Sequence, residues 1–175
     1  AGAHFPDFLL ATLGTGIGGG LVIGGKLWRG PGGMAGEFGH IQVGHHRVCG
    51  CGAKGCLEAI ASARAMERLG EEGFGKLIPL PELASLARSA TPDARAQTVF
   101  RVAGEAFGEA LATVALLLDL RVYLVGGGGA PVLDLLAPHA LAVLDRRAFG
   151  RHSSDFTLLA ARLGNDAGVL GAAML

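Results

Sequence analysis

The cysteines and one histidine lie in a single short stretch of this chain. All three cysteines follow the histidine closely, and the four positions are His40, Cys49, Cys51 and Cys56. Three thiolates and one imidazole form the ligand set of a closed tetrahedral zinc site. Glycines between and beside the cysteines allow a short loop to turn all three sulfurs inward. We therefore predict a structural Zn2+ site, which fixes the fold of a long loop. His45 and His46 are nearer to Cys49 and remain alternatives to His40 as the fourth ligand.

Two carboxylates flank this ligand set, Glu37 before His40 and Glu58 after Cys56. A carboxylate next to a metal ligand is held in place by the loop and can accept hydrogen bonds from hydroxyl groups. The two acids therefore point to a polar substrate. The alternative is that both side chains only cap a helix or a loop.

Composition excludes several classes of protein. The 175 residues are half hydrophobic and 17% charged, with a formal net charge of zero. A neutral chain with scattered basic residues has no electrostatic footprint for nucleic acid or for a charged membrane surface. The longest apolar run, 111–118, is too short to cross a bilayer, and no signal sequence is visible at the N-terminus. Clustered cysteines that cannot all pair favour a reducing compartment. We therefore expect a cytoplasmic protein that is not secreted.

Hydrophobic periodicity and turn signals predict one compact α/β unit over residues 1–175. Gly24 and Gly25 form a two-residue hairpin turn, so a purely parallel sheet is excluded. Ser62 is a helix N-cap, and the glycines of 70–75 end its helix near Leu69. The predicted strands are 8–13, the two arms of the hairpin 21–28, 41–43, 121–125 and 156–160. The predicted helices are 62–69, 81–90, 93–118, 132–145 and 167–174.

Two glycine-rich loops follow predicted strands, at 13–20 and 125–129. Backbone N–H groups that are clustered without side chains form a concavity suited to phosphate. The first loop is followed by a strand-like segment instead of a helix, which excludes a Rossmann site, and it lacks the Gly-Lys-Ser/Thr ending of a P-loop. Each loop can bind a nucleotide or simply form a tight turn.

Taken together, five segments resemble the ROK family (repressor, open reading frame, kinase), which includes bacterial glucokinases. In family order they are the phosphate loop 13–20, the Glu-x-Gly-His segment within 30–40, the zinc motif 49–58, the adenosine loop 125–128 and the C-terminal signature 163–168. The resemblance covers nearly the whole chain. It implies the actin/hexokinase-like (ribonuclease H-like) ATPase fold, of which this chain would be the C-terminal lobe, with a mixed sheet, a hairpin and a zinc-binding loop.

The resemblance also implies roles for single residues. Glu37, His40 and Glu58 would bind sugar hydroxyls, and His40 would also ligate zinc with the three cysteines. ATP with Mg2+ would be the cofactor. Its phosphates would face Gly14, Thr15 and Gly16, and its adenosine would face Gly127 and Gly128. The family further suggests a homodimer.

One family element has no counterpart in the sequence. The aspartate that removes the proton from the attacking sugar hydroxyl would lie before Ala1, so no catalytic base is assigned within 1–175. Asp166 resembles that motif but belongs to the C-terminal signature, and Asp7 is interpreted as a turn residue. We therefore expect a sugar kinase that acts on glucose or a close relative. The lobe formed by this chain should be inactive alone. The alternatives are a sugar-sensing ROK repressor and a non-catalytic zinc-stabilised fragment.

Overall fold

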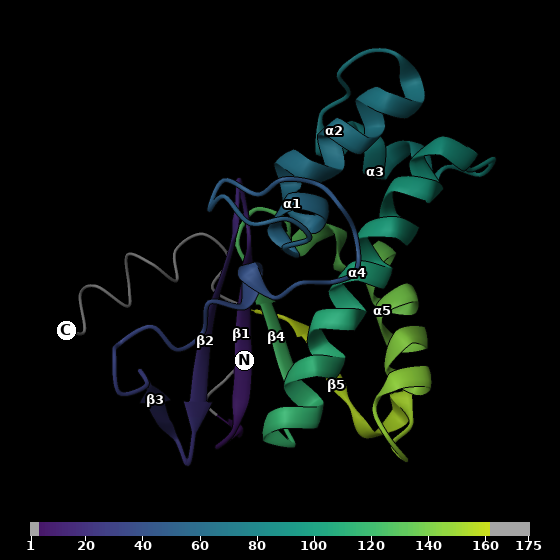
Figure 1. The fold of residues 1–175 in the computed structure, drawn as a ribbon. Helices are drawn as coiled ribbons and strands as arrows, with labels where there is room; N and C mark the ends of the chain where they lie inside the picture. Colours follow the sequence, from purple (N-terminus) through teal and green to yellow (C-terminus); the bar gives the residue numbers. More distant parts are fainter. Residues whose placement is uncertain (1–3, 162–175) are drawn as a thin grey trace.

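The computed structural model describes residues 4–161, which form a five-stranded mixed sheet covered by helices (Figure 1). The strand order is β3-β2-β1-β4-β5. The strands are β1 (Phe8–Leu13), β2 (Ile17–Ile23), β3 (Lys26–Trp28), β4 (Val122–Gly126) and β5 (Thr157–Ala160). The first three pair antiparallel, whereas β4 runs parallel to both β1 and β5. The mixed α/β sheet predicted from the sequence is confirmed.

The helices gather on one side of the sheet and at its upper end (Figure 1). They are α1 (Glu58–Ala61), α2 (Ala63–Phe74), α3 (Leu80–Arg88), α4 (Ala94–Leu118) and α5 (Leu133–Arg147). Short 3-10 turns lie at Phe38–His40, Ala130–Val132 and Ser153–Asp155. Within residues 4–161, no helix combines the length and apolarity needed to cross a membrane. The predicted helix 167–174 and the segment 163–168, with Asp166, lie outside the described residues.

The long helix α4 forms the centre of the core. Asp93 caps its start by accepting the N–H of Arg95, at 2.8 Å, and Asp119 ends it in the left-handed conformation. One face buries Phe100, Phe107 and Leu111. The ring of Phe107 meets that of Phe38 edge to face at 5.6 Å, so the core connects the helices with the segment that precedes the cysteines.

The predicted end of the helix 62–69 is wrong. Ser62 is the N-cap, as predicted, but α2 continues through Gly70 to Phe74. A Cβ atom at Gly70 would lie 2.9 Å from Leu83 Cδ1, so this glycine allows α3 to approach α2 closely. The helix ends only at Gly75, which has a φ of 72°.

Two other predictions need correction. The segment 41–43 forms no strand. It pairs with the end of the cysteine loop, which offers only an isolated bridge between Gln42 and Cys56. The predicted glycine loop 13–20 is shorter: β1 and β2 form a hairpin, and Gly14, Thr15 and Gly16 make its turn. Gly18, Gly19 and Gly20 belong to β2, and at Gly19 the backbone of Gly36 covers the strand. A Cβ atom at Gly19 would overlap the carbonyl oxygen of Gly36.

Asp7 has a structural role, as interpreted from the sequence. Its carboxylate accepts the N–H of Gly24 at 2.6 Å, which secures the turn of the β2–β3 hairpin. Gly24 and Gly25 both have positive φ values, of 59° and 74°, which a tight primed turn requires.

Candidate functional site

The structure brings together the four side chains predicted to bind zinc. One ligand atom from each of His40, Cys49, Cys51 and Cys56 lies within 4.8 Å of all the others. The chain reaches this arrangement through a loop with few backbone pairs. Three of its hydrogen bonds are Val43 N–H to Gly55 O, Cys49 N–H to Ala53 O and Leu57 N–H to Ile41 O. His45 and His46 are not in the group.

Distances within the group fit a tetrahedral ion. The Sγ atoms of Cys51 and Cys56 are 3.7 Å apart, and Cys49 Sγ is 3.7 Å from His40 Nδ1. Metal–sulfur bonds of about 2.3 Å in a tetrahedron give ligand separations of about 3.8 Å. The donor set and its spacing therefore fit zinc.

The two ring nitrogens of His40 face different surroundings. Nδ1 lies next to Cys49, within the group, whereas Nε2 is 3.9 Å from a carboxylate oxygen of Glu37. A histidine that ligates a metal through one nitrogen keeps an N–H on the other, and this N–H can donate to an acceptor. His40 thus connects the metal group to the carboxylates.

His45 instead supports the loop. Its Nδ1 accepts the backbone N–H of Arg47 at 3.1 Å, which leaves Nε2 to donate to the carbonyl of Cys56 at 2.9 Å. Because both ring nitrogens are used by the backbone, His45 has no lone pair available for a metal.

The thiols differ in acidity. Burial raises the pKa of the Cys56 thiol to about 12, whereas a hydrogen bond from the backbone of Ala53 lowers the pKa of Cys51. Metal ions bind thiolates, so binding must displace the proton of Cys56. Metal affinity should therefore rise with pH.

Glu58, the first residue of α1, joins the metal group to the glycine turn. Its Oε2 accepts the N–H of Ile17 at 2.9 Å, and its Oε1 lies 3.7 Å from Cys49 Sγ. A Cβ atom at Gly16 would overlap Oε2, so the turn approaches Glu58 this closely only because residue 16 is glycine. The requirement for Gly16 is thus steric, which the sequence pattern did not reveal.

The predicted sugar residues and both glycine loops border one open cavity of about 530 Å³, here called the carboxylate cavity. Its lining includes Gly14, Gly16, Glu37, His40, Glu58, Gly127 and Gly128. The loops meet because Gly129 donates its N–H to the carbonyl of Leu13 at 2.8 Å. Gly127, with a φ of 80°, leaves no room for a side chain against Leu13.

A second cavity of about 580 Å³ shares Gly14 and Gly128 with the first and is here called the α3 cavity. Its walls are mostly apolar, and they are formed by Thr15, Ala63, Leu80, Pro81, Ala84, Ser85, Arg88, Pro131 and Val132. The sequence reasoning missed the contribution of α3 to this cavity. The only available signal was the amphipathic helix that begins near Pro81, and such a helix is usually just a packing element.

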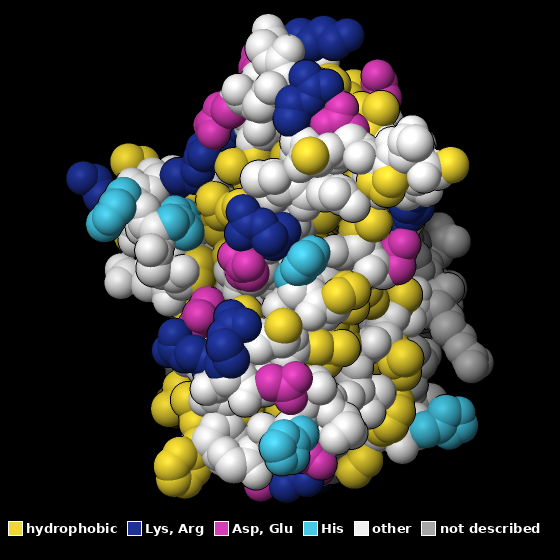
Figure 2. All heavy atoms as spheres, turned by 90° about the vertical axis from the view of Figure 1, so that its right-hand side faces the viewer, with side chains coloured by type: hydrophobic (Ala, Val, Ile, Leu, Met, Phe, Trp, Pro, Cys, Tyr) yellow, Lys and Arg dark blue, Asp and Glu magenta, His cyan; other side chains and the backbone are white. Residues whose placement is uncertain are grey.

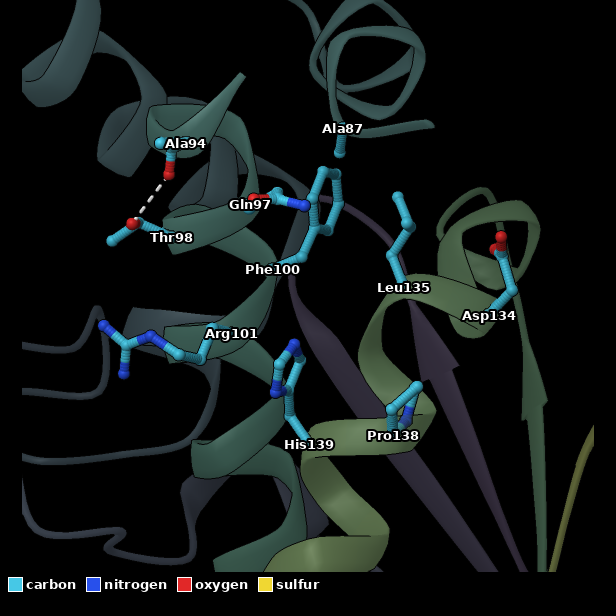
Figure 3. A pocket seen from close by; sticks show the side chains of 10 residues that line it. All are labelled: Ala87, Ala94, Gln97, Thr98, Phe100, Arg101, Asp134, Leu135, Pro138 and His139. Carbon is cyan, nitrogen blue, oxygen red and sulfur yellow. Dashed lines mark hydrogen bonds between the residues drawn. The ribbon is translucent and has the colours of Figure 1, made fainter. Parts of the chain in front are cut away.

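A further cavity of about 500 Å³ lies between α4 and α5 and contains no predicted site residue (Figure 3). Phe100 and Leu135 line it together with His139 and the charged Arg101 and Asp134. Both charged groups have partners already, since Arg101 pairs with Glu105 and Asp134 pairs with Arg88. Figure 2 shows this side of the molecule, where acidic and basic side chains alternate with hydrophobic ones. The two charged side chains of this cavity are therefore already engaged and not free for a ligand.

The chain is similar in sequence to known sugar kinases. An N-acetylmannosamine kinase of Escherichia coli is 36% identical over 170 residues, which are 97% of this chain and 56% of that protein. The chain thus spans about half the length of the curated relatives it matches.

Solved structures of two kinds are similar. A ROK glucokinase of Streptomyces griseus in complex with glucose and AMPPNP superposes with a TM-score of 0.85 at 35% identity, over 99% of this chain and 61% of that one. A ROK transcriptional regulator, a homologue of the E. coli MLC protein, gives 0.82 at 26% identity, over 98% and 46%. The ROK family model matches residues 1–175. This chain belongs to the ROK family.

Proposed function

We propose that this chain forms the sugar- and nucleotide-contacting lobe of an ATP-dependent hexose kinase. The observation that carries the proposal is the carboxylate cavity, in which Glu37, His40 and Glu58 face the same space as the Gly14–Gly16 turn and Gly127. Phosphoryl transfer requires that an acceptor hydroxyl and a terminal phosphate meet in line. A cavity that joins hydroxyl acceptors to glycine turns has the layout for this meeting.

In this proposal the sugar lies against the carboxylates. Vicinal hydroxyls donate to Glu37 and Glu58, and these charge-assisted hydrogen bonds set the orientation of the ring. His40 adds a donor through Nε2, since its Nδ1 faces the cysteines. Zinc, held by His40 and the three cysteines, would keep this loop in shape. The kinase relatives make glucose and N-acetylmannosamine the first sugars to test.

The nucleotide occupies the α3 cavity in this proposal. The mostly apolar walls from α3 and Val132 suit an adenine ring. Gly127 and Gly128 would lie along the adenosine, and Thr15 and Gly16 along the phosphates with their Mg2+. The cavities share Gly14, which is where the transfer would take place. The aspartate base would come from the part of the relatives' length that this chain does not span.

The experiment is Glu58→Gln in the whole protein. Glutamine can still accept the N–H of Ile17, so the turn should survive, but the anionic acceptor for sugar is lost. We expect the dissociation constants for glucose and N-acetylmannosamine to rise roughly tenfold, with no change in zinc content. Glu71→Gln, on the exposed side of α2, is the matched control. Unchanged sugar binding in the Glu58 variant would contradict the proposed role.

A sugar-sensing repressor is the second candidate, favoured by the similarity to the ROK regulator. A sensor needs the carboxylate cavity but has no use for ATP in the α3 cavity. Sugar-dependent turnover of ATP by the whole protein would support the kinase, whereas sugar-dependent DNA binding without turnover would support the sensor. The proposal also places the protein in the cytoplasm as a homodimer, and sedimentation velocity tests the oligomeric state.

A further inference from the structure

A third cavity adjoins the two proposed to hold substrate, and two arginines line it. It has a volume of about 240 Å³ and is here called the arginine cavity. It shares Thr15 with the α3 cavity and Glu58 with the carboxylate cavity, and Arg64 and Arg68 of α2 form part of its wall. All three cavities therefore border the glycine turn 14–16, and the arginine and carboxylate cavities also share the start of α1.

Three arginines line these three cavities, and they are Arg64, Arg68 and Arg88. Arg88 is already engaged, because its guanidinium binds the carboxylate of Asp134 and the carbonyl of Pro131. Within residues 4–161, by contrast, Arg64 and Arg68 form no ion pair. Their N–H donors are thus available to a ligand.

The acidic side chain on the arginine cavity is Glu58, and one of its oxygens already accepts the N–H of Ile17. Cys49 also lines the cavity, and zinc bound by three thiolates would add one net negative charge. Two guanidinium groups balance these charges and still present several N–H donors. A phosphate group would therefore be held mainly by directed hydrogen bonds, for which the planar guanidinium is well suited.

We propose that Arg64 and Arg68 bind the terminal phosphate of the phosphoryl donor in the arginine cavity, next to Thr15. This rests on the proposed function. A donor whose adenosine lies in the α3 cavity must bring its last phosphate to the border of the carboxylate cavity. The arginine cavity lies beside that border, since it shares Thr15 with the α3 cavity and Glu58 with the carboxylate cavity. Cationic donors there neutralise the charge that phosphoryl transfer places on the phosphate oxygens.

Calorimetric titration of the intact protein tests this without turnover. The probes are Mg2+ complexes of AMPPNP and ADP, together with inorganic tripolyphosphate. The variants are Arg64→Gln and Arg68→Gln, with Arg101→Gln as the matched control, since Arg101 is an exposed helical arginine outside all three cavities. Both test residues are exposed, so the variants should keep the melting temperature of the unmodified protein.

We expect AMPPNP and tripolyphosphate to bind about fivefold to tenfold more weakly to each test variant, because a charged hydrogen-bond donor is lost. ADP, which lacks the terminal phosphate, should bind within about twofold of its original affinity, as should all three probes to the control. Unchanged AMPPNP binding, an equal loss for ADP, or an equal loss in the control would overturn the proposal.

Sugar phosphorylation is measured separately. If it persists while the arginines prove irrelevant, only this inference fails; arginine-dependent tripolyphosphate binding without any sugar turnover would reject only the proposed function.

Discussion

The cysteine loop and the α4–α5 pair are stabilised in opposite ways. Between His40 and Glu58 the structure has no helix and no strand, only two isolated bridges. The buried apolar group beside the cysteines is small, consisting of Cys49, Cys56 and Ala59 with Ala53 against it. Helices α4 and α5, by contrast, lie side by side and share the main core (Figure 1).

The difference shows where a metal is needed. Burial of apolar area stabilises by about 25 cal/mol per Å², so the helices can hold each other through packing alone. The cysteine loop buries too little for that, and yet it positions His40 and leads directly into Glu58. A bound ion can supply the missing free energy. The part of the molecule that borders the carboxylate cavity is therefore the part expected to depend on zinc.

The largest expected effect comes from Cys51→Ser. Loss of one thiolate should lower the zinc content and the melting temperature together, with a cost in unfolding free energy of roughly 4 kcal/mol. Metal analysis and calorimetry of the same sample check both quantities. His46→Ala is the control, because this histidine lies in the loop but outside the group. A full metal complement in the cysteine variant would contradict the ligand assignment.

An intermediate effect is expected from Gly108→Ala in α4. An added Cβ would lie 2.6 Å from the carbonyl oxygen of Ala140 and 2.7 Å from Val143 Cβ, so the two helices must move apart. Overpacking of this kind costs about 1–3 kcal/mol. Because packing and not metal holds this pair, zinc content should not change.

Gly73→Ala in α2 is the matched control for this prediction. Its Cβ would meet only Arg95 Cβ, at an ordinary 3.7 Å, so the better helix propensity of alanine should stabilise by up to about 1 kcal/mol. Chemical denaturation measures both variants. Equal effects of the two substitutions would show that the close approach of α4 to α5 is not tight.

The sequence predicted the α4–α5 part and the hairpin well, because local signals there agree with the tertiary structure. The predicted helix 93–118 corresponds to α4, with Asp93 as its cap, and Gly24 with Gly25 forms the predicted primed turn. The errors occur where a contact from elsewhere in the chain overrides the local signal. Gly70 suggested a helix end, but it serves the approach of Leu83, 13 positions later in the chain.

The candidate site divides in the same way. The metal group could be predicted from the sequence, because three cysteines and a histidine in one short stretch are themselves a zinc ligand set. The α3 cavity and the arginine cavity were not predictable, because Arg64, Arg68 and Arg88 look like ordinary exposed helix residues until the fold places their helices around Thr15.

The smallest expected effect concerns an exposed contact that is neither metal nor packing, the pair of Arg88 in α3 with Asp134 in α5. Its hydrogen bonds with Arg88 lower the pKa of Asp134 from the ordinary 3.8. A carboxylate with a depressed pKa stabilises the fold above its ordinary value, and this contribution is lost as the pH falls through the lowered value. Both side chains are largely exposed, so solvent screening keeps the contribution below about 1 kcal/mol.

Asp134→Asn should therefore destabilise slightly at neutral pH, and the difference from the unmodified protein should shrink below pH 3.8. A double-mutant cycle with Arg88→Gln, measured by denaturant unfolding, isolates the pair. If the coupling free energy of the pair exceeded the loss of unfolding free energy caused by Gly108→Ala, the ranking of metal first, packing second and surface charge last would be wrong. Because both side chains are exposed, we expect this coupling free energy to vanish in high salt.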